Sequence, residues 1–181
     1  VKPDNVVMCK LGCEDNSFRD IEFSDIMLVD FGRAVDMEDH CTQGQDARSI
    51  MFRGDACLDE MKCVAMRSGN PWSYDIDTFG VLACAHVMLY GSHIKLKKDR
   101  NSRWSLVNSF KRYWQRDLWT KVFGTLLNLD EESGAAIGSR ARSLRSLREE
   151  ITAYTEKESD KLRSFLTRQL SLLPTSRDQL A

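Results

Sequence analysis

Short apolar runs that favour β-structure occur twice before residue 30. One is Val6-Val7-Met8 and the other is Ile26-Met27-Leu28-Val29. Runs of this length and composition predict strands. The residues between them, from Lys10 to Ser24, are rich in Asp, Glu, Asn and Ser. They predict a solvated loop that joins the two strands of a short hairpin.

A longer run predicts one buried helix. It follows Ser73 and continues to Gly91 with apolar residues on nearly every side, the pattern of a helix at the centre of a domain. Gly91 is suited to cap its end, because glycine adopts the left-handed conformation without strain. A membrane-spanning segment is the rival interpretation. The run is too short to cross a bilayer, however, and it begins beside Asp75 and Asp77.

Between Trp104 and Leu129 apolar residues recur at helical spacing. This spacing predicts two core helices broken near Arg116-Asp117. The preceding stretch, His93 to Arg103, is basic. We expect it to be a solvated loop between helices, and docking of an acidic partner segment is the alternative.

Large apolar residues also recur every three or four positions from Arg140 to Leu173. They predict a long amphipathic helix, or a helix pair, ended by Pro174. Asp130 to Ser139 predicts a linker before it. We expect the helical segment to pack on the rest of the domain. A partner-binding coiled coil is the alternative, although Glu158 interrupts the apolar stripe.

The overall charge gives no general attraction to polyanions. The 181 residues carry 26 lysines and arginines against 27 aspartates and glutamates, a formal net charge of −1. We therefore expect no direct nucleic-acid binding and no membrane attachment. The 6 cysteines include no C-x-x-C pair and no histidine spacing suited to zinc. This predicts reduced intracellular thiols, with Cys84 in the core.

Two motifs with candidate chemistry adjoin the predicted strands. Lys2-Pro3-Asp4-Asn5 precedes the first strand and Asp30-Phe31-Gly32 follows the second. Asp30 offers a carboxylate and Asn5 an amide carbonyl, the oxygen ligands that magnesium prefers. The Lys2 ammonium is a compact charge suited to a phosphate. Either motif alone is equally compatible with an ordinary turn.

In this order, the two motifs and the segment Ser73 to Val81 resemble the catalytic loop, the D-F-G segment and the start of the central helix of a protein kinase. The resemblance implies a protein-kinase-like fold (α+β), C-terminal lobe only, mainly α-helical with a short β-hairpin at the catalytic loop and D-F-G. Asp30 to Met37, Gly69 to Val81 and Met88 to Gly91 are similar to the Bub family of spindle-assembly-checkpoint serine/threonine kinases.

This resemblance implies ATP and Mg²⁺ as cofactors and a site drawn from both motifs. Asn5 and Asp30 would bind the metal, Lys2 would be catalytic beside the transferred phosphate, and the nucleotide would meet Val7, Phe31 and Gly32. The implied activity is transfer of the ATP γ-phosphate to serine or threonine of a protein substrate, including a histone tail. The implied partners are checkpoint and kinetochore proteins. The implied location is the nucleus and kinetochore, with a cytoplasmic pool.

The same resemblance divides residues 1–181 of a partial kinase domain into four parts. We expect residues 1–35 to hold the catalytic loop, the inserted hairpin loop and D-F-G, and residues 36–72 to be the activation segment. Residues 73–129 would hold the central core helices, and residues 140–174 the C-terminal amphipathic helices. No glycine-rich phosphate loop and no V-A-I-K lysine occurs in the chain, which is shorter than a whole kinase of roughly 250 residues.

Departures from the kinase pattern keep a second interpretation open, a catalytically inactive pseudokinase lobe that acts as a checkpoint scaffold. Asn5 and Asp30 are 25 positions apart, against roughly a dozen in a typical kinase. Ala65 replaces the glutamate expected at the end of the activation segment. The central-helix aspartate is either Asp75 or Asp77.

Two further expectations concern activity. The aspartate that accepts the substrate proton is expected immediately before Val1, so we expect the 181-residue chain to be catalytically silent by itself. We also expect the activation-segment hydroxyls Thr42 and Ser49 to be unmodified. Phosphorylation that orders the segment through Arg48 or Arg53 is the alternative.

Overall fold

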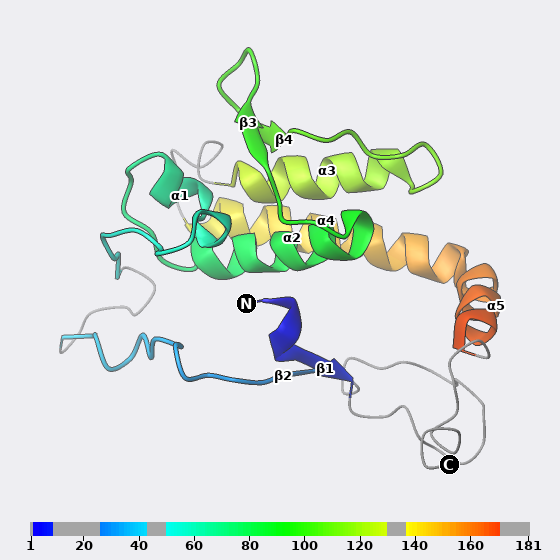
Figure 1. Ribbon diagram of the computed structural model, residues 1–181, viewed down its shortest axis with the longest axis horizontal. Helices are drawn as coiled ribbons and strands as arrows, with labels where there is room; N and C mark the ends of the chain where they lie inside the picture. The colour runs from blue at the N-terminus through cyan, green and yellow to red at the C-terminus, as the bar shows by residue number, and fades with distance from the viewer. Residues whose placement is uncertain (1, 9–25, 43–49, 130–136, 171–181) are drawn as a thin grey trace.

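The computed structural model describes residues 2–8, 26–42, 50–129 and 137–170, and its helices dominate (Figure 1). In chain order the elements are η1 (Pro3–Asn5), β1 (Val6–Met8), β2 (Ile26–Leu28), η4 (Asp59–Met61), α1 (Val64–Arg67), α2 (Asp75–Tyr90), β3 (Leu96–Lys98), β4 (Trp104–Leu106), α3 (Arg116–Leu127), α4 (Ile137–Lys157) and α5 (Ser159–Leu170). The predicted α+β class, mainly helical with a short hairpin near Asp30-Phe31-Gly32, is confirmed.

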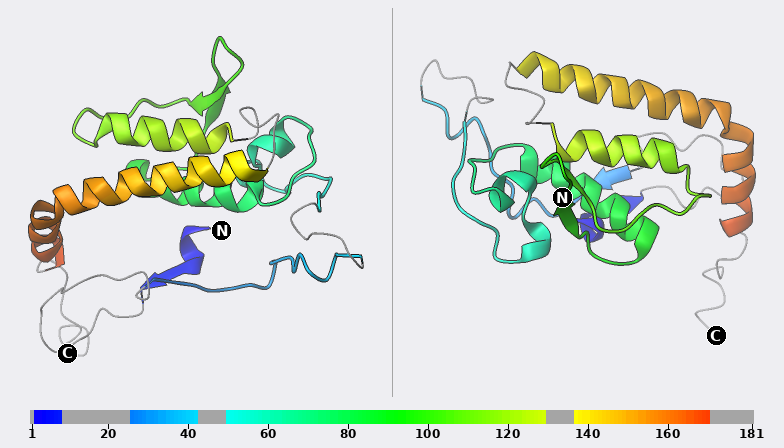
Figure 2. Two further views of the ribbon diagram at one scale, coloured as in Figure 1. Left: turned by 180° about the vertical axis from the view of Figure 1, so that it is seen from behind. Right: turned by 90° about the horizontal axis from the view of Figure 1, so that it is seen from above.

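Three helices form the body of the molecule. Helix α3 packs against α2 on one side and against α4 on the other, as the two views of Figure 2 make clear. Their buried side chains form one core, which includes Phe79, Leu82, Val122, Phe123 and Leu147. The helical spacing of these apolar positions places them along one stripe of each helix, where they meet the facing stripe.

Helix α2 confirms the helix predicted after Ser73. Gly91 caps its C-terminus with φ 66°, and the Gly91 N–H donates to the carbonyl oxygen of Val87 at 2.8 Å. Cys84 is buried, as expected. The helix is not enclosed on every side, because Val81 and Met88 are 53% and 75% exposed. None of the described helices is both long enough and apolar enough for a transmembrane span.

Strands β1 and β2 confirm the predicted hairpin strands. They pair antiparallel with Val6 opposite Leu28 and Val7 opposite Met27. The loop predicted between Lys10 and Ser24 lies outside the described residues. The hairpin and η1 lie beside α2, with η1 in contact with that helix (Figure 1).

The prediction for residues 104–129 was wrong in its first half. Trp104–Leu106 is strand β4, paired with β3, and a loop leads from it to the single helix α3. The basic stretch expected to be a loop therefore contributes a strand of a second hairpin. Apolar residues such as Leu106 and Phe110 do pack into the core, but from a strand and a loop. Spacing alone does not distinguish such a segment from a helix.

The C-terminal prediction of a helix pair is confirmed by α4 and α5. Glu158 separates them, and its N–H still donates to the carbonyl of Tyr154 at 3.0 Å. The predicted linker was too long, since α4 already begins at Ile137. Leu147 packs into the shared core, which confirms packing on the domain for that part of the helix. Pro174 lies outside the described residues.

Candidate functional site

Pairing of β1 with β2 brings the two sequence motifs together. The ladder extends one residue past the strands, because the Val29 N–H donates to the Asn5 carbonyl oxygen at 2.8 Å. Directly beyond it, the side-chain amide Nδ2 of Asn5 donates to the carbonyl oxygen of Asp30 at 3.5 Å. Residues 25 positions apart in the sequence are thus neighbours at one end of the hairpin.

Asp30 occupies the left-handed region, with φ 62°. Few non-glycine residues adopt this conformation, although aspartate does so more often than most. The residue is exposed. A Cβ added at Gly32 would lie 3.4 Å from Asp30 Oδ1, so the carboxylate sits over the Gly32 backbone. The backbone therefore turns sharply at Asp30, with its carbonyl oxygen against Asn5 and its carboxylate over Gly32.

Three other predicted site residues, Lys2, Val7 and Phe31, are exposed. Lys2 is exposed, and its carbonyl accepts the Asn5 N–H at 3.0 Å. Within the described residues, no ion pair joins the Lys2 ammonium to a carboxylate. Val7 lies in β1, 39% exposed, and Phe31 is 62% exposed. The hairpin thus offers a partly apolar surface next to the two polar site residues.

The donors present fit a hard divalent cation. Asn5 contributes a carbonyl oxygen that its Nδ2 contact leaves available, and Asp30 contributes two carboxylate oxygens. Magnesium is commonly held by one or two protein groups together with phosphates. The described residues contain no cluster of three or more His, Cys, Asp or Glu side chains suited to a metal. A cation at Asn5 and Asp30 would therefore take its remaining ligands from elsewhere.

The two candidate central-helix aspartates have different surroundings. The Asp75 carboxylate accepts the backbone N–H of Ser73 at 3.0 Å and is half-buried, whereas Asp77 is exposed. Both lie in the first turn of α2, where a negative charge is favourable near the helix N-terminus. The polar contact to Ser73 places Asp75 closer to the loop that precedes the helix.

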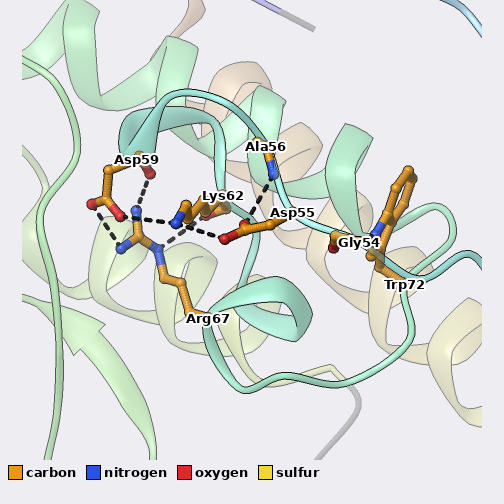
Figure 3. Close-up of polar contacts among 7 residues, drawn as sticks. All are labelled: Gly54, Asp55, Ala56, Asp59, Lys62, Arg67 and Trp72. Atoms are coloured by element: carbon orange, nitrogen blue, oxygen red, sulfur yellow. Dashed lines mark hydrogen bonds and ion pairs between the residues drawn. The ribbon is translucent and has the colours of Figure 1, made fainter.

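The end of the activation segment contains a polar cluster that the sequence did not reveal. Figure 3 shows the Arg67 guanidinium against Asp59, with 3.1 Å from Nη1 to Oδ2, and Lys62 against Asp55 at 2.7 Å. The hydrogen bond from Lys62 is the main reason that the pKa of Asp55 is lowered. No single helix or strand carries either pair, because residues 55–58 and 62–63 belong to no helix or strand, so the pairing depends on how the chain folds between the partners.

The same segment is closed by a bridge between Phe52 and Trp72. Their backbones exchange two hydrogen bonds, 2.8 and 3.0 Å long, and the Trp72 indole N–H donates to the Gly54 carbonyl at 3.2 Å (Figure 3). Ala65, in the position expected for glutamate, is buried in α1. A buried alanine leaves no carboxylate at that position. Ser49 lies outside the described residues, and Thr42 is exposed.

No protein-family model matches the chain. The chain is 37% identical over 112 residues to the spindle assembly checkpoint serine/threonine-protein kinase BUB1 of Saccharomyces cerevisiae, covering 62% of this chain and 10% of that protein. It is 32% identical over 148 residues to the mitotic checkpoint serine/threonine-protein kinase BUB1 of Arabidopsis thaliana, covering 80% of this chain and 27% of that protein. The chain thus spans about a quarter or less of the length of these curated relatives.

The solved structures include a similar fold. A crystal structure of the BubR1 kinase domain aligns with a TM-score of 0.70 and 26% sequence identity, covering 93% of this chain and 46% of that chain. The chain is a protein-kinase C-lobe that resembles the Bub family of spindle-assembly-checkpoint serine/threonine kinases.

Proposed function

We propose that the chain is the lower half of an ATP-dependent serine/threonine protein kinase that acts in spindle-assembly-checkpoint signalling. The observation that carries the proposal is the contact of Asn5 with Asp30 across the β1–β2 hairpin. Similarity to BUB1 kinases supports the substrate class, protein serine and threonine hydroxyls. The proposed partners are kinetochore and checkpoint proteins, and a histone tail is a proposed substrate. The proposed location is the nucleus and kinetochore, with a cytoplasmic pool.

Each site residue has a role that follows from its chemistry and place. Asn5 and Asp30 would hold magnesium through their side-chain oxygens. When bound, Mg–ATP would supply the phosphoryl group, and its metal would neutralise charge on the phosphates. Lys2, close in sequence to Asn5 and exposed, would position an ammonium near that charge. Exposed apolar surface at Val7 and Phe31 would meet the nucleotide, and Gly32 leaves room for the Asp30 carboxylate.

None of these six residues is assigned as the proton acceptor for the substrate hydroxyl or as an upper clamp on the nucleotide. We therefore propose that the 181 residues are catalytically silent by themselves. Their contribution would be the metal ligands, the lysine and the lower apolar surface. The test of function accordingly uses the complete gene product.

The first test compares Asp30→Asn with Asp36→Asn in the complete gene product. Both changes replace a carboxylate by an amide of the same shape at an exposed residue. The Asp36 carboxylate caps the Glu38 N–H at 2.9 Å, and an asparagine oxygen can accept the same bond. Calorimetry with and without magnesium should show ATP binding at least about tenfold weaker in Asp30→Asn, about 1.4 kcal/mol, and unchanged in Asp36→Asn. Equal magnesium-dependent binding in both variants would exclude Asp30 as a metal ligand.

A scaffold function without phosphoryl transfer is the second candidate, and the buried Ala65 favours it. Without a glutamate at this position, the end of the activation segment depends on local pairs such as Asp59 with Arg67. On this hypothesis the unaltered protein binds no Mg–ATP, and checkpoint arrest in cells survives Asp30→Asn. Checkpoint arrest would instead be lost in a Leu82→Asp variant, because a charged side chain at this buried position disrupts α2. Loss of arrest in Asp30→Asn cells with normal protein abundance would exclude the scaffold function.

A further inference from the structure

The β3–β4 hairpin stands out from the helical body at the top of Figure 1. Its turn is closed by Asp99, whose Oδ1 accepts the N–H groups of Asn101 and Arg103 at 2.8 and 2.9 Å. On the inner side, Leu106 is buried and β4 contacts α3. The hairpin is therefore a rigid projection, anchored through β4, and β3 is its outer strand.

The two edges of this hairpin differ in how their backbone groups are paired. Asn128 covers the β4 edge, accepting the Trp104 N–H at 2.7 Å and donating to the Trp104 carbonyl at 3.0 Å. Lys95 with Val107, and Asp99 with Arg103, are hydrogen-bonded pairs of the β3–β4 ladder. In an antiparallel ladder the residues between such pairs point their N–H and C=O groups outward. On β3 these are Leu96 and Lys98, and no described residue bonds them.

The surface beside this open edge is strongly cationic. Five basic residues and one acidic residue lie between His93 and Arg103, and all six are exposed (Lys95, Lys97, Lys98, Arg100, Arg103 and Asp99). The one carboxylate is already engaged by the turn. Among the described residues, no carboxylate forms an ion pair with any of the lysines. This local excess contrasts with a chain whose formal net charge is −1.

The lysines also have defined directions. Lys98 lies over the Trp104 ring, 4.9 Å from its centroid, on the face that carries the buried Leu106. Lys95 and Lys97, two residues apart, share the opposite face, because side chains alternate along a strand. That outward face carries Ser105 and Val107 but no aromatic ring, so it lacks the stacking surface on which single-stranded nucleic acids depend.

We propose that the open edge of β3 binds an extended acidic peptide segment of a protein partner as a third strand. Backbone groups at Leu96 and Lys98 would pair with the peptide, and carboxylates at alternate peptide positions would meet Lys95 and Lys97. Strand addition of this kind takes affinity from main-chain hydrogen bonds and specificity from alternate side chains. Lysines on an edge also oppose pairing with a second copy of the same strand. The inference does not depend on nucleotide binding at Asn5 and Asp30.

The test measures binding of a fluorescent 12-residue peptide of alternating glutamate and threonine to the 181-residue chain. Lys95→Glu with Lys97→Glu should weaken binding roughly tenfold or more, as should raising the salt concentration, because exposed charges are screened. The matched control, Arg148→Glu with Lys157→Glu, makes the same charge change at exposed positions of α4. It should leave the affinity unchanged. Equal losses in the two double variants would overturn the proposal, since net charge would explain them.

Two further probes separate the mode of binding and the class of partner. The same peptide methylated at alternate amide nitrogens keeps its charge but loses hydrogen bonds, and it should bind much more weakly. Equal affinity of the methylated peptide would overturn strand addition. If a 12-nucleotide single-stranded DNA or phosphatidylserine vesicles bound the chain more tightly than the acidic peptide does, the surface would be assigned to nucleic acid or membrane instead. Dimerisation of the chain that the acidic peptide reverses would assign the surface to a second copy.

Discussion

At the scale of single residues, Asn128 holds three backbone groups with one side chain. It is 2% exposed. Its amide accepts the Trp104 N–H and donates to the carbonyls of Trp104 and Gly124 at 3.0 and 2.7 Å. The side chain therefore substitutes for a neighbouring strand along β4 and ties that strand to the end of α3. Buried backbone groups depend on such partners, because water does not reach them.

Replacing Asn128 by alanine should lower the free energy of unfolding by about 2–4 kcal/mol, because the N–H and carbonyl groups of the half-buried Trp104 lose their partners. Asn108→Ala removes the same side chain at an exposed position and should change the stability by less than about 0.5 kcal/mol. Urea unfolding followed by circular dichroism measures both. Equal stability of the two variants would show that the Asn128 contacts contribute nothing.

The sequence allowed the candidate site to be predicted but not these supporting contacts. Asn5 and Asp30 stand in motifs next to strand-forming runs, so local pattern led to them. Asn128 bonds a residue 24 positions away, and Arg67 of α1 pairs with Asp59 of the separate helix η4. Such contacts arise only when the chain has folded, and the residue types involved are common at any surface. The physical chemistry of a lone asparagine gives no indication of its partner.

At the scale of elements, α4 illustrates how one face attaches a helix to the body. Leu147 is 4% exposed and lies in the core with Val122, Phe123 and Leu127. Leu144, three residues earlier on the same helix, is 40% exposed. The attachment of α4 to α3 thus depends on a narrow apolar stripe. Close to it, Lys121 of α3 forms an ion pair with Glu150 of α4.

Leu147→Ala should lower the free energy of unfolding by about 2–5 kcal/mol, the usual cost of emptying a buried leucine site. Leu144→Ala should cost less than about 1 kcal/mol, because its side chain is already partly in water. Both variants keep helix propensity high, since alanine is the best helix former. Chemical unfolding of the two proteins provides the comparison. A larger loss for Leu144→Ala would mean that α4 attaches through a different face.

The sequence pattern predicted some of these elements correctly and others wrongly. Helices α4 and α5 match the sequence prediction because apolar residues recur every three or four positions along them, and α2 matches because its apolar run is long and continuous. Strand β4 was mistaken for helix because three residues are too short to show a period of two. The signal for the hairpin lies in its turn, where Asp99 caps two backbone N–H groups and Ser102 has φ 61°.

At the scale of the whole molecule, burial changes the ionisation of several groups. Desolvation raises the pKa of the thiols of Cys63 and Cys84 above their ordinary value of 9.0. It also raises the pKa of the Tyr90 hydroxyl above 10.0. In each case the folded state retains its proton at a pH where the unfolded chain has begun to release it. The contribution of these three groups to stability is therefore fully present below about pH 8 and is lost as the pH rises.

The free energy of unfolding should fall progressively from pH 8 to pH 10.5, as the unfolded chain gains from ionisation. Urea titrations across this range measure the fall. Cys63→Ala should make the slope shallower, because it removes a fully buried thiol. Cys57→Ala, at an exposed cysteine, should leave the slope unchanged. A constant free energy between pH 8 and pH 10.5 would contradict the assigned role of burial.

The pairing of β1 with β2 has a consequence for how this site tolerates change. Register alone sets Asn5 beside Asp30, with Val6 opposite Leu28. The number of residues that connect the strands does not enter that geometry. A change in the number of residues between the two strands is therefore expected to leave Asn5 and Asp30 side by side, as long as the register of β1 against β2 is kept.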